Sequence, residues 1–170
     1  MKILLIVLGC VVLLIAAVVA IGFALPKHHV ATRSAAYRAS PEQMFALIEG
    51  SQNWRPDVLH SETYFDCAAG KMLSETSRNG QTMLYEISAV DPPRSLTRRI
   101  ASKNLPFAGS WTYALEPSPG GVIVRITEDA EIYNPVFRFV TRFILGETRS
   151  IDAYLHALGK ATGQDVQVGP

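Results

Sequence analysis

Apolar residues follow two patterns along the chain: one uninterrupted block, and then a long stretch in which apolar and polar positions alternate. The block is residues 3–25, 23 consecutive residues without a charge. A helix of that length spans roughly 34 Å, slightly more than the ~30 Å hydrocarbon core of a bilayer. Lys2 precedes the block, and Pro26 and Lys27 end it. The pattern predicts a single-pass membrane anchor over residues 1–27, followed by one soluble domain.

Two other interpretations of the block stay open. A cleaved secretory signal has a shorter apolar core, about 7–15 residues, and ends at small residues such as those at 18–20 or 22–24. A lipoprotein signal is the second alternative, because residues 7–10 (Val-Leu-Gly-Cys) resemble a lipobox, although the apolar block continues well beyond Cys10. We favour a retained anchor. The flanking positive charges do not indicate on which side of the membrane the domain lies.

The alternating region predicts a sheet with a short helix near its start, followed by a second short helix or turn at residues 53–56. Residues 28–38 are expected to form the first strand. Ser40 and Pro41 suit the N-cap and first position of a helix over residues 41–48. Between residues 58 and 132 we expect about six strands in a meander, separated by turn residues. Asn79-Gly80 is a strong signal for a tight hairpin.

The last hairpin of this meander can be given a register. If residues 117–120 form a four-residue loop, Trp111 lies opposite Ile126 and Tyr113 lies opposite Val124. Because side chains alternate across a strand, these aromatic and aliphatic residues share one face of the sheet. The register therefore predicts a one-sided sheet with a large aromatic inner face.

A single long helix over residues 135–160 is expected to cover that face, with Asn134 as its N-cap. Apolar residues recur in this segment at helical spacing: Val136, Val140, Phe143, Ile144, Ile151, Leu155 and Leu158. Gly146 interrupts the pattern. It marks either a bend in the helix or a place where the helix backbone closely approaches another part of the protein. The whole pattern predicts an α+β fold, a curved antiparallel sheet of about seven strands around one C-terminal helix. One helix cannot fill such a sheet, so we expect an internal cavity.

Several short motifs in this order carry a resemblance to a known superfamily. They are Ser40-Pro41 with Phe45, Trp54-Arg55-Pro56, Asp91-Pro92-Pro93, residues 105–111, residues 120–128, residues 134–139, and Tyr154-Leu155 with Leu158. Over residues 30–160 the chain resembles the SRPBCC superfamily, which includes START-like lipid-transfer domains and polyketide cyclase/dehydrase-like proteins. The resemblance implies a helix-grip fold with a hydrophobic ligand cavity. It does not fix a reaction, because this fold serves binders, transfer proteins and enzymes.

Six residues are candidates for ligand contact. Four are aromatic and expected to face inward, either as core or as cavity lining: Tyr85, Trp111, Tyr113 and Phe143. Two are charged: Arg98 shares a strand face with Leu96 and Ile100, and Glu128 continues the face of residues 122–126. A buried guanidinium needs a carboxylate or an anionic group. Arg98 is therefore expected either to pair with Glu128 or to receive a ligand carboxylate or carbonyl. The alternative is that both residues lie at strand ends and reach water.

Composition and charge narrow the functions. Of 16 Lys and Arg, Lys2 and Lys27 flank the block, which leaves 14 against 15 Asp and Glu and argues against nucleic-acid binding. Of the two cysteines, Cys10 lies in the block and Cys67 is the single cysteine of the domain. The four histidines lack metal-ligand spacing. His28 and His29 adjoin the block and are expected to be interfacial. We expect no metal, no cofactor, no nucleophile elbow and no phosphate loop.

The sequence thus predicts an anchor at 1–27, an SRPBCC-like domain at 28–162 and a tail at 163–170. Its favoured function is a membrane-tethered binding module for a lipid or another hydrophobic small molecule. A cyclase- or dehydratase-like enzyme is one alternative, and an interaction protein with a vestigial pocket is another. Binding is favoured over catalysis. The sequence does not decide whether the domain catalyses a reaction.

Overall fold

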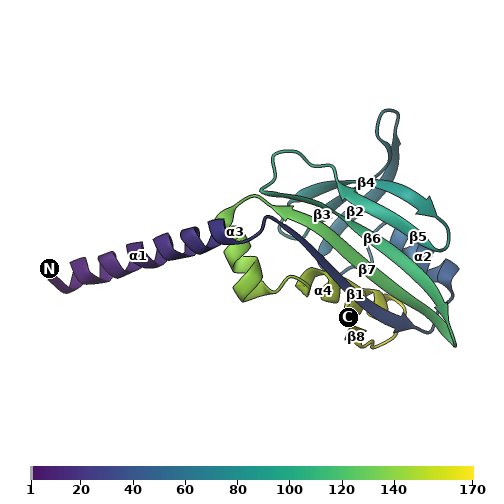
Figure 1. Cartoon of the computed structure of the whole chain (residues 1–170). Coiled ribbons are helices and arrows are strands. Elements are labelled where there is room, and N and C mark those ends of the chain that lie inside the picture. The colour runs from purple at the N-terminus through teal and green to yellow at the C-terminus, as the bar shows by residue number, and fades with distance from the viewer. Residues whose placement is uncertain (1) are drawn as a thin grey trace.

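Helix α1 (Lys2–Ala24) extends away from the rest of the chain in the computed structural model, which describes residues 2–170 (Figure 1). Its side chains are exposed along most of its length, and the helix is long and apolar enough to cross a membrane. The predicted helix over the apolar block is confirmed. That it crosses a membrane stays a prediction, because a signal sequence near the N-terminus passes the same test of length and composition.

Eight strands among the described residues form one antiparallel sheet in the order β2-β3-β4-β5-β6-β7-β1-β8. They are β1 (His28–Tyr37), β2 (Val58–Asp66), β3 (Gly70–Ser77), β4 (Thr82–Asp91), β5 (Ser95–Ile100), β6 (Phe107–Ser118), β7 (Gly121–Ile132) and β8 (Val168–Gly169). The expected antiparallel sheet is confirmed, and so are the six strands of the meander. The short β8 belongs to the expected tail and pairs with β1 at Ser34 and Ala35.

Local sequence signals explain where several elements begin and turn. Helix α2 (Pro41–Glu49) starts at a capping box, in which the Ser40 hydroxyl accepts from the Gln43 amide and the Gln43 side chain accepts from the Ser40 amide. Gly80 has a φ of +84°, which glycine adopts without steric cost, and the β3–β4 hairpin turns there as predicted.

The β6–β7 turn is shorter than expected. Pro119 and Gly120 alone connect the strands, and the φ of Gly120 is +88°, as in a turn with proline second and glycine third. Trp111 therefore lies opposite Glu128 instead of Ile126. The predicted four-residue loop is wrong, and as a result the predicted pairing of β6 with β7 is shifted by two residues. Because strand side chains alternate with a period of two, every residue keeps its predicted face.

The single long C-terminal helix is also wrong. The segment forms α3 (Pro135–Val140), one π-helical turn η1 (Thr141–Leu145) and then α4 (Arg149–Ala161). Gly146 has a φ of +84°, which ends η1 and redirects the chain. Only α4 lies against the inner face of the sheet, where Ile151, Leu155 and Leu158 are completely buried. The core between sheet, α2 and α4 therefore receives only the second half of the predicted apolar stripe.

Helix α3 packs instead on the C-terminal end of α1. Gly22 lies against the backbone of Pro135 so closely that a Cβ there would overlap the proline carbonyl oxygen. The buried Arg138 side chain donates from Nη1 to the Leu25 carbonyl, at 2.7 Å. This hydrogen bond satisfies one of the carbonyls that a helix end leaves without a partner. The end of α1 is thus fixed to the domain by packing and by a buried hydrogen bond.

Candidate functional site

A cavity of about 640 Å³ lies between the inner face of the sheet and the α3–η1–α4 segment. Its size falls within the roughly 300–1,000 Å³ typical of small-molecule sites. Aromatic, aliphatic and a few charged side chains line it, among them Arg55, Glu75, Tyr85, Arg98, Ile100, Phe107, Trp111, Tyr113, Glu128, Ile132, Phe137 and Leu145. Neighbouring strands β3 to β7 supply most of these residues. The expected internal cavity is present.

Five of the six predicted contact residues line this cavity: Tyr85, Arg98, Trp111, Tyr113 and Glu128. They converge because they stand on the inner face of adjacent strands. Their role in binding stays a prediction. The inward placement of Phe143 is wrong, because its side chain is 60% exposed on η1. Phe143 was assigned to a continuous helix that would have turned it toward the sheet, and η1 turns it outward.

Arg98 is buried at the inner end of the cavity, with 4% of its surface exposed. Its Nη2 donates to the Ile48 carbonyl, and its guanidinium lies over the Tyr113 ring at 5.2 Å from the centroid. Its Nε has no hydrogen-bond partner among residues 2–170, and no carboxylate in that range forms an ion pair with it. The predicted Arg98–Glu128 pair is therefore wrong. The guanidinium keeps a donor that protein groups leave unused.

An ion pair that sequence reasoning missed lies in the cavity wall. Arg55 donates from Nη1 to both carboxylate oxygens of Glu75, at 2.9 and 3.1 Å. Burial raises the pKa of Glu75, and the positive charge of Arg55 offsets part of that rise. Glu75 could have been found, because it shares a strand face with the fully buried Leu73. The same criterion singled out Arg98.

Two tyrosines, Tyr85 and Tyr113, line the cavity, and a third, Tyr154, packs against Tyr113 outside the lining. Tyr154 of α4 packs its ring at 5.5 Å from Tyr113 and 5.7 Å from Trp111, and its hydroxyl donates to the buried Gln52 at 3.0 Å. Burial raises the pKa of Tyr85, Tyr113 and Tyr154. A tyrosine hydroxyl is protonated at neutral pH and burial favours that form further, so Tyr85 and Tyr113 can donate hydrogen bonds in the cavity while adding no negative charge.

Glu128 joins a second polar cluster in the wall. It accepts from the Trp111 indole at 2.6 Å and from the Ser150 hydroxyl at 3.3 Å, and His29 Nε2 lies 3.2 Å from its other oxygen. His29 was expected to be interfacial, but its half-buried side chain lines the cavity. The missed signal is alternation along β1, where His29 shares a face with the buried Ala31 and Ala35. A carboxylate and an imidazole in contact can accept or donate protons.

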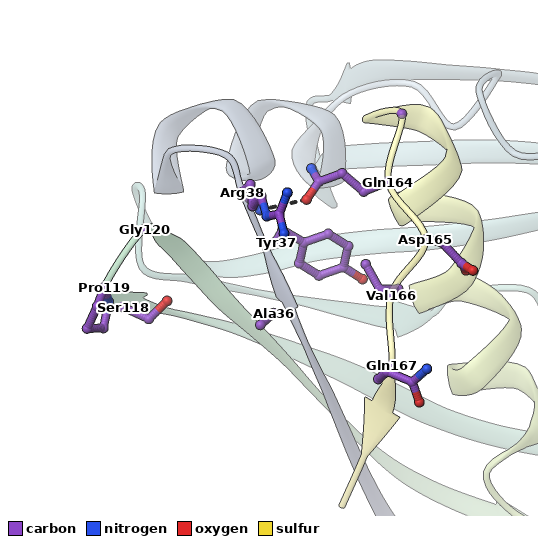
Figure 2. Close-up of a pocket in the computed structure, with 11 residues that line it drawn as sticks. Ala36, Tyr37, Arg38, Ser118, Pro119, Gly120, Gln164, Asp165, Val166 and Gln167 are labelled. Atoms are coloured by element: carbon purple, nitrogen blue, oxygen red, sulfur yellow. Dashed lines mark hydrogen bonds between the residues drawn. The ribbon is translucent and has the colours of Figure 1, made fainter.

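A second hollow, of about 460 Å³, lies between β1, the β6–β7 turn and residues 163–167 (Figure 2). Figure 2 shows Arg38 beside Gln164, whose side-chain oxygen accepts from the Arg38 amide at 2.7 Å. The residues that line this hollow turn mostly polar side chains and backbone groups toward it. None of the six predicted contact residues lies in this hollow, so the larger cavity is the candidate site.

Comparisons with solved structures identify the same fold in other proteins. Norcoclaurine synthase from Thalictrum flavum is 14% identical, with a TM-score of 0.60 over 79% of this chain and 86% of that chain. Protein MLL2253 from Mesorhizobium loti is 20% identical, with a TM-score of 0.56 over 79% and 97%. Ginseng major latex-like protein 151 from Panax ginseng is 13% identical, with a TM-score of 0.59 over 80% and 95%. At these identities the likeness shows the fold alone.

A search of curated protein sequences gives no match. A family model does match, over residues 28–161, and its description is "Polyketide cyclase / dehydrase and lipid transport". The match spans strands β1 to β7, the cavity and helices α2 to α4. It agrees with the helix-grip fold of the solved structures and confirms the SRPBCC resemblance. The domain that follows α1 therefore makes this chain a member of the polyketide cyclase/dehydrase and lipid transport family.

Proposed function

We propose that this chain is a membrane-tethered binding module that holds a lipid or another hydrophobic small molecule in the 640 Å³ cavity. The observation that carries the proposal is the cavity, because a space lined largely by aromatic and aliphatic side chains favours an apolar occupant. Each Å² of apolar surface removed from water contributes roughly 25 cal/mol to such binding. The lipid transport named in the family description supports the same class of ligand. Helix α1 supplies the tether.

The polar residues of the cavity define the ligand further. Arg98 offers an unused buried donor at the inner end, where the tyrosine hydroxyls are protonated. Phe137 and Leu145, with 37% and 40% of their surface exposed, lie at the outer end. A ligand that fits both ends has one carboxylate or carbonyl group and an apolar body. Its acceptor would satisfy Arg98, and its apolar part would cover the outer residues.

Native mass spectrometry of the full chain, extracted in mild detergent, tests this function. We expect a bound adduct of lipid-like mass. Ala153→Trp places a large side chain in the cavity lining and should remove the adduct, whereas Ala161→Trp, on the same helix but outside the lining, should retain it. Thermal unfolding of both variants checks that they fold. Wild-type protein without an adduct from any membrane extract would refute the proposal.

A second candidate function is cyclase- or dehydratase-like catalysis. The observation that favours it is the contact of His29 with Glu128 in the cavity wall, a carboxylate–imidazole pair able to move a proton. Glu128→Gln should then abolish turnover of an identified substrate while the adduct remains. Unchanged turnover would remove the proposed role of Glu128. The third alternative, a vestigial pocket, is disfavoured by the cavity volume.

A further inference from the structure

The α3–η1 segment (residues 135–145) presents apolar side chains on two sides. Phe137, Thr141 and Leu145 follow one another at intervals of four residues and line the cavity. Phe143 and Ile144 point outward, with 60% and 67% of their surface exposed. A segment of a water-soluble domain normally turns such side chains toward its core. This segment therefore lies between the cavity and a second apolar environment.

The position of α1 identifies that environment. Pro135 packs on Gly22, and Arg138 donates to Leu25, so α3 begins at the C-terminal end of α1. Figure 1 shows the α3–η1 segment running across that end of α1 instead of continuing its direction. A helix of 23 residues exceeds the hydrocarbon thickness by only a few Å, so its last turn lies at the membrane boundary. The α3–η1 segment is held at the same depth.

Polar and aromatic residues around the segment suit this boundary. Tyr133 is exposed just before α3, and Arg142 is exposed within η1, where it forms an ion pair with Glu147 at 3.0 Å. Lys27 follows the end of α1. Exposed tyrosine and long basic side chains beside Phe and Ile are typical of segments that lie in the headgroup region.

Part of the cavity mouth lies in this segment, and the rest lies at Gln81 and along Arg149, Ser150 and Ala153, which also line the cavity and are exposed. Phe137 and Leu145 line the cavity and are also partly exposed, so they mark its outer rim. Thr141 Oγ1 is buried beside them and has no hydrogen-bond partner among residues 2–170. The π-helical turn and the positive φ of Gly146 end the segment with irregular backbone, which is frequent at functional positions.

We propose that the α3–η1 segment inserts Phe143 and Ile144 into the leaflet from which α1 emerges, so that the cavity opens directly into the bilayer. A hydrophobic ligand then passes between leaflet and cavity past Phe137 and Leu145 without crossing water. The route rests on the proposed binding function. The contact between the segment and the bilayer needs no ligand; it rests on the tethering part of the proposed function, with α1 in the membrane, and on the exposed side chains.

Spin labelling of the full chain in phosphatidylcholine nanodiscs tests the contact. Cys10 and Cys67 are both exposed, so they are first replaced by Ala and Ser, and single cysteines are then placed at Ile144 and at Asp165. Asp165 is exposed beside the hollow of Figure 2 and serves as the control. We expect the label at position 144 to be accessible to oxygen and protected from a water-soluble nickel chelate. The label at position 165 should show the reverse.

Two outcomes would overturn the contact. One is a label at position 144 that the chelate reaches as readily as the label at position 165. The other is a label that both reagents fail to reach in a particle whose mass corresponds to two chains, because a second copy of the chain would then cover Phe143 and Ile144. Neither outcome depends on whether a ligand is bound.

Ligand loading tests the route. Wild type and the double variant Phe143→Asp/Ile144→Asp, stripped of adduct and reconstituted, are incubated with vesicles of phosphatidylcholine and oleic acid and then examined by native mass spectrometry. The exposed substitutions leave the core intact, and they should slow loading several-fold, whereas Asp165→Asn should not. Equal loading rates in all three proteins would refute the route. Wild type that never loads, with the label at position 144 in the bilayer, would refute the binding function but leave the contact standing.

Discussion

Replacing Arg98 by Met should stabilise the protein and abolish its ligand binding. The guanidinium is buried without an ion pair, and its Nε is unused. Methionine has a similar length, carries no charge and packs well in irregular apolar space. Glu75 keeps its ion pair with Arg55 after the substitution. A residue that costs stability in the empty protein and gains a partner only from the ligand is a binding residue.

The expected size follows from opposing contributions. The substitution loses a charge-assisted hydrogen bond to Ile48, about 1.5–3 kcal/mol, and a cation–π contact with Tyr113 that contributes up to about 2 kcal/mol. It removes a desolvation cost of several kcal/mol and an unsatisfied donor that costs about 1–3 kcal/mol. Methionine then buries apolar surface in the same place. We expect a net gain of about 2 kcal/mol, or roughly 4–8 °C in Tm.

Thermal unfolding of the full chain in detergent measures this gain, with the fluorescence of Trp54 and Trp111 as the signal. Arg99→Met is the matched control, because Arg99 is the next residue of β5 and is exposed. The control should leave both Tm and adduct unchanged. A lower Tm for Arg98→Met, with Arg99→Met unaffected, would refute the reasoning, since it would mean that the protein alone satisfies Arg98.

Three further changes test other parts of the structure. Leu155→Ala removes a fully buried side chain of α4 and should lower the free energy of unfolding by about 2–5 kcal/mol in urea denaturation; a loss under about 0.5 kcal/mol would contradict the core described above. Because burial raises the pKa of Glu75, the protonated form stabilises the folded state below the unfolded pKa, and this contribution is lost as the pH rises through the folded pKa. The stability of wild type relative to Glu75→Gln should therefore fall as the pH rises above about 4.5, and a flat difference would contradict the shift. Gly22→Leu should separate α1 from α3 and speed tryptic cleavage after Lys27, whereas Gly9→Leu, with open space around it, should not; equal cleavage rates would argue against the α1–α3 contact.

Much of the sheet could be predicted because local chemistry determines it. Asn79-Gly80 specifies its hairpin wherever the hairpin lies in the fold, and Ser40 with Gln43 closes a capping box within four residues. The face of Tyr113 was correct although the β6–β7 register was wrong by two residues. Alternation therefore predicts which side chains face the cavity more securely than it predicts their partners across strands.

The C-terminal segment could not be predicted in the same way. Phe143 and Ile144 fit the helical period of the buried Ile151 and Leu155, and periodicity does not distinguish an apolar face on the core from one turned outward. The deciding contact is the packing of Pro135 on Gly22, more than a hundred residues earlier in the chain.

Partners of the buried charges also depend on long-range geometry. Arg98 and Glu128 share the cavity, but Glu128 is occupied by Trp111 and His29, and Arg98 is held by the carbonyl of Ile48 from α2. A strand pattern shows that a charge faces inward. It does not show which of several inward groups lies within hydrogen-bond distance.

Only residues 25–27 separate α1 from β1, and the carbonyl of Lys27 accepts from the amide of Ile132 at 2.8 Å. Such a junction leaves no free linker, so a change in the tilt of α1 would turn the whole domain. Helices tilt more where the bilayer is thinner. In a membrane, the angle at which the cavity meets the lipid would then depend on bilayer thickness, and the same chain would present its cavity differently in membranes of different lipid composition.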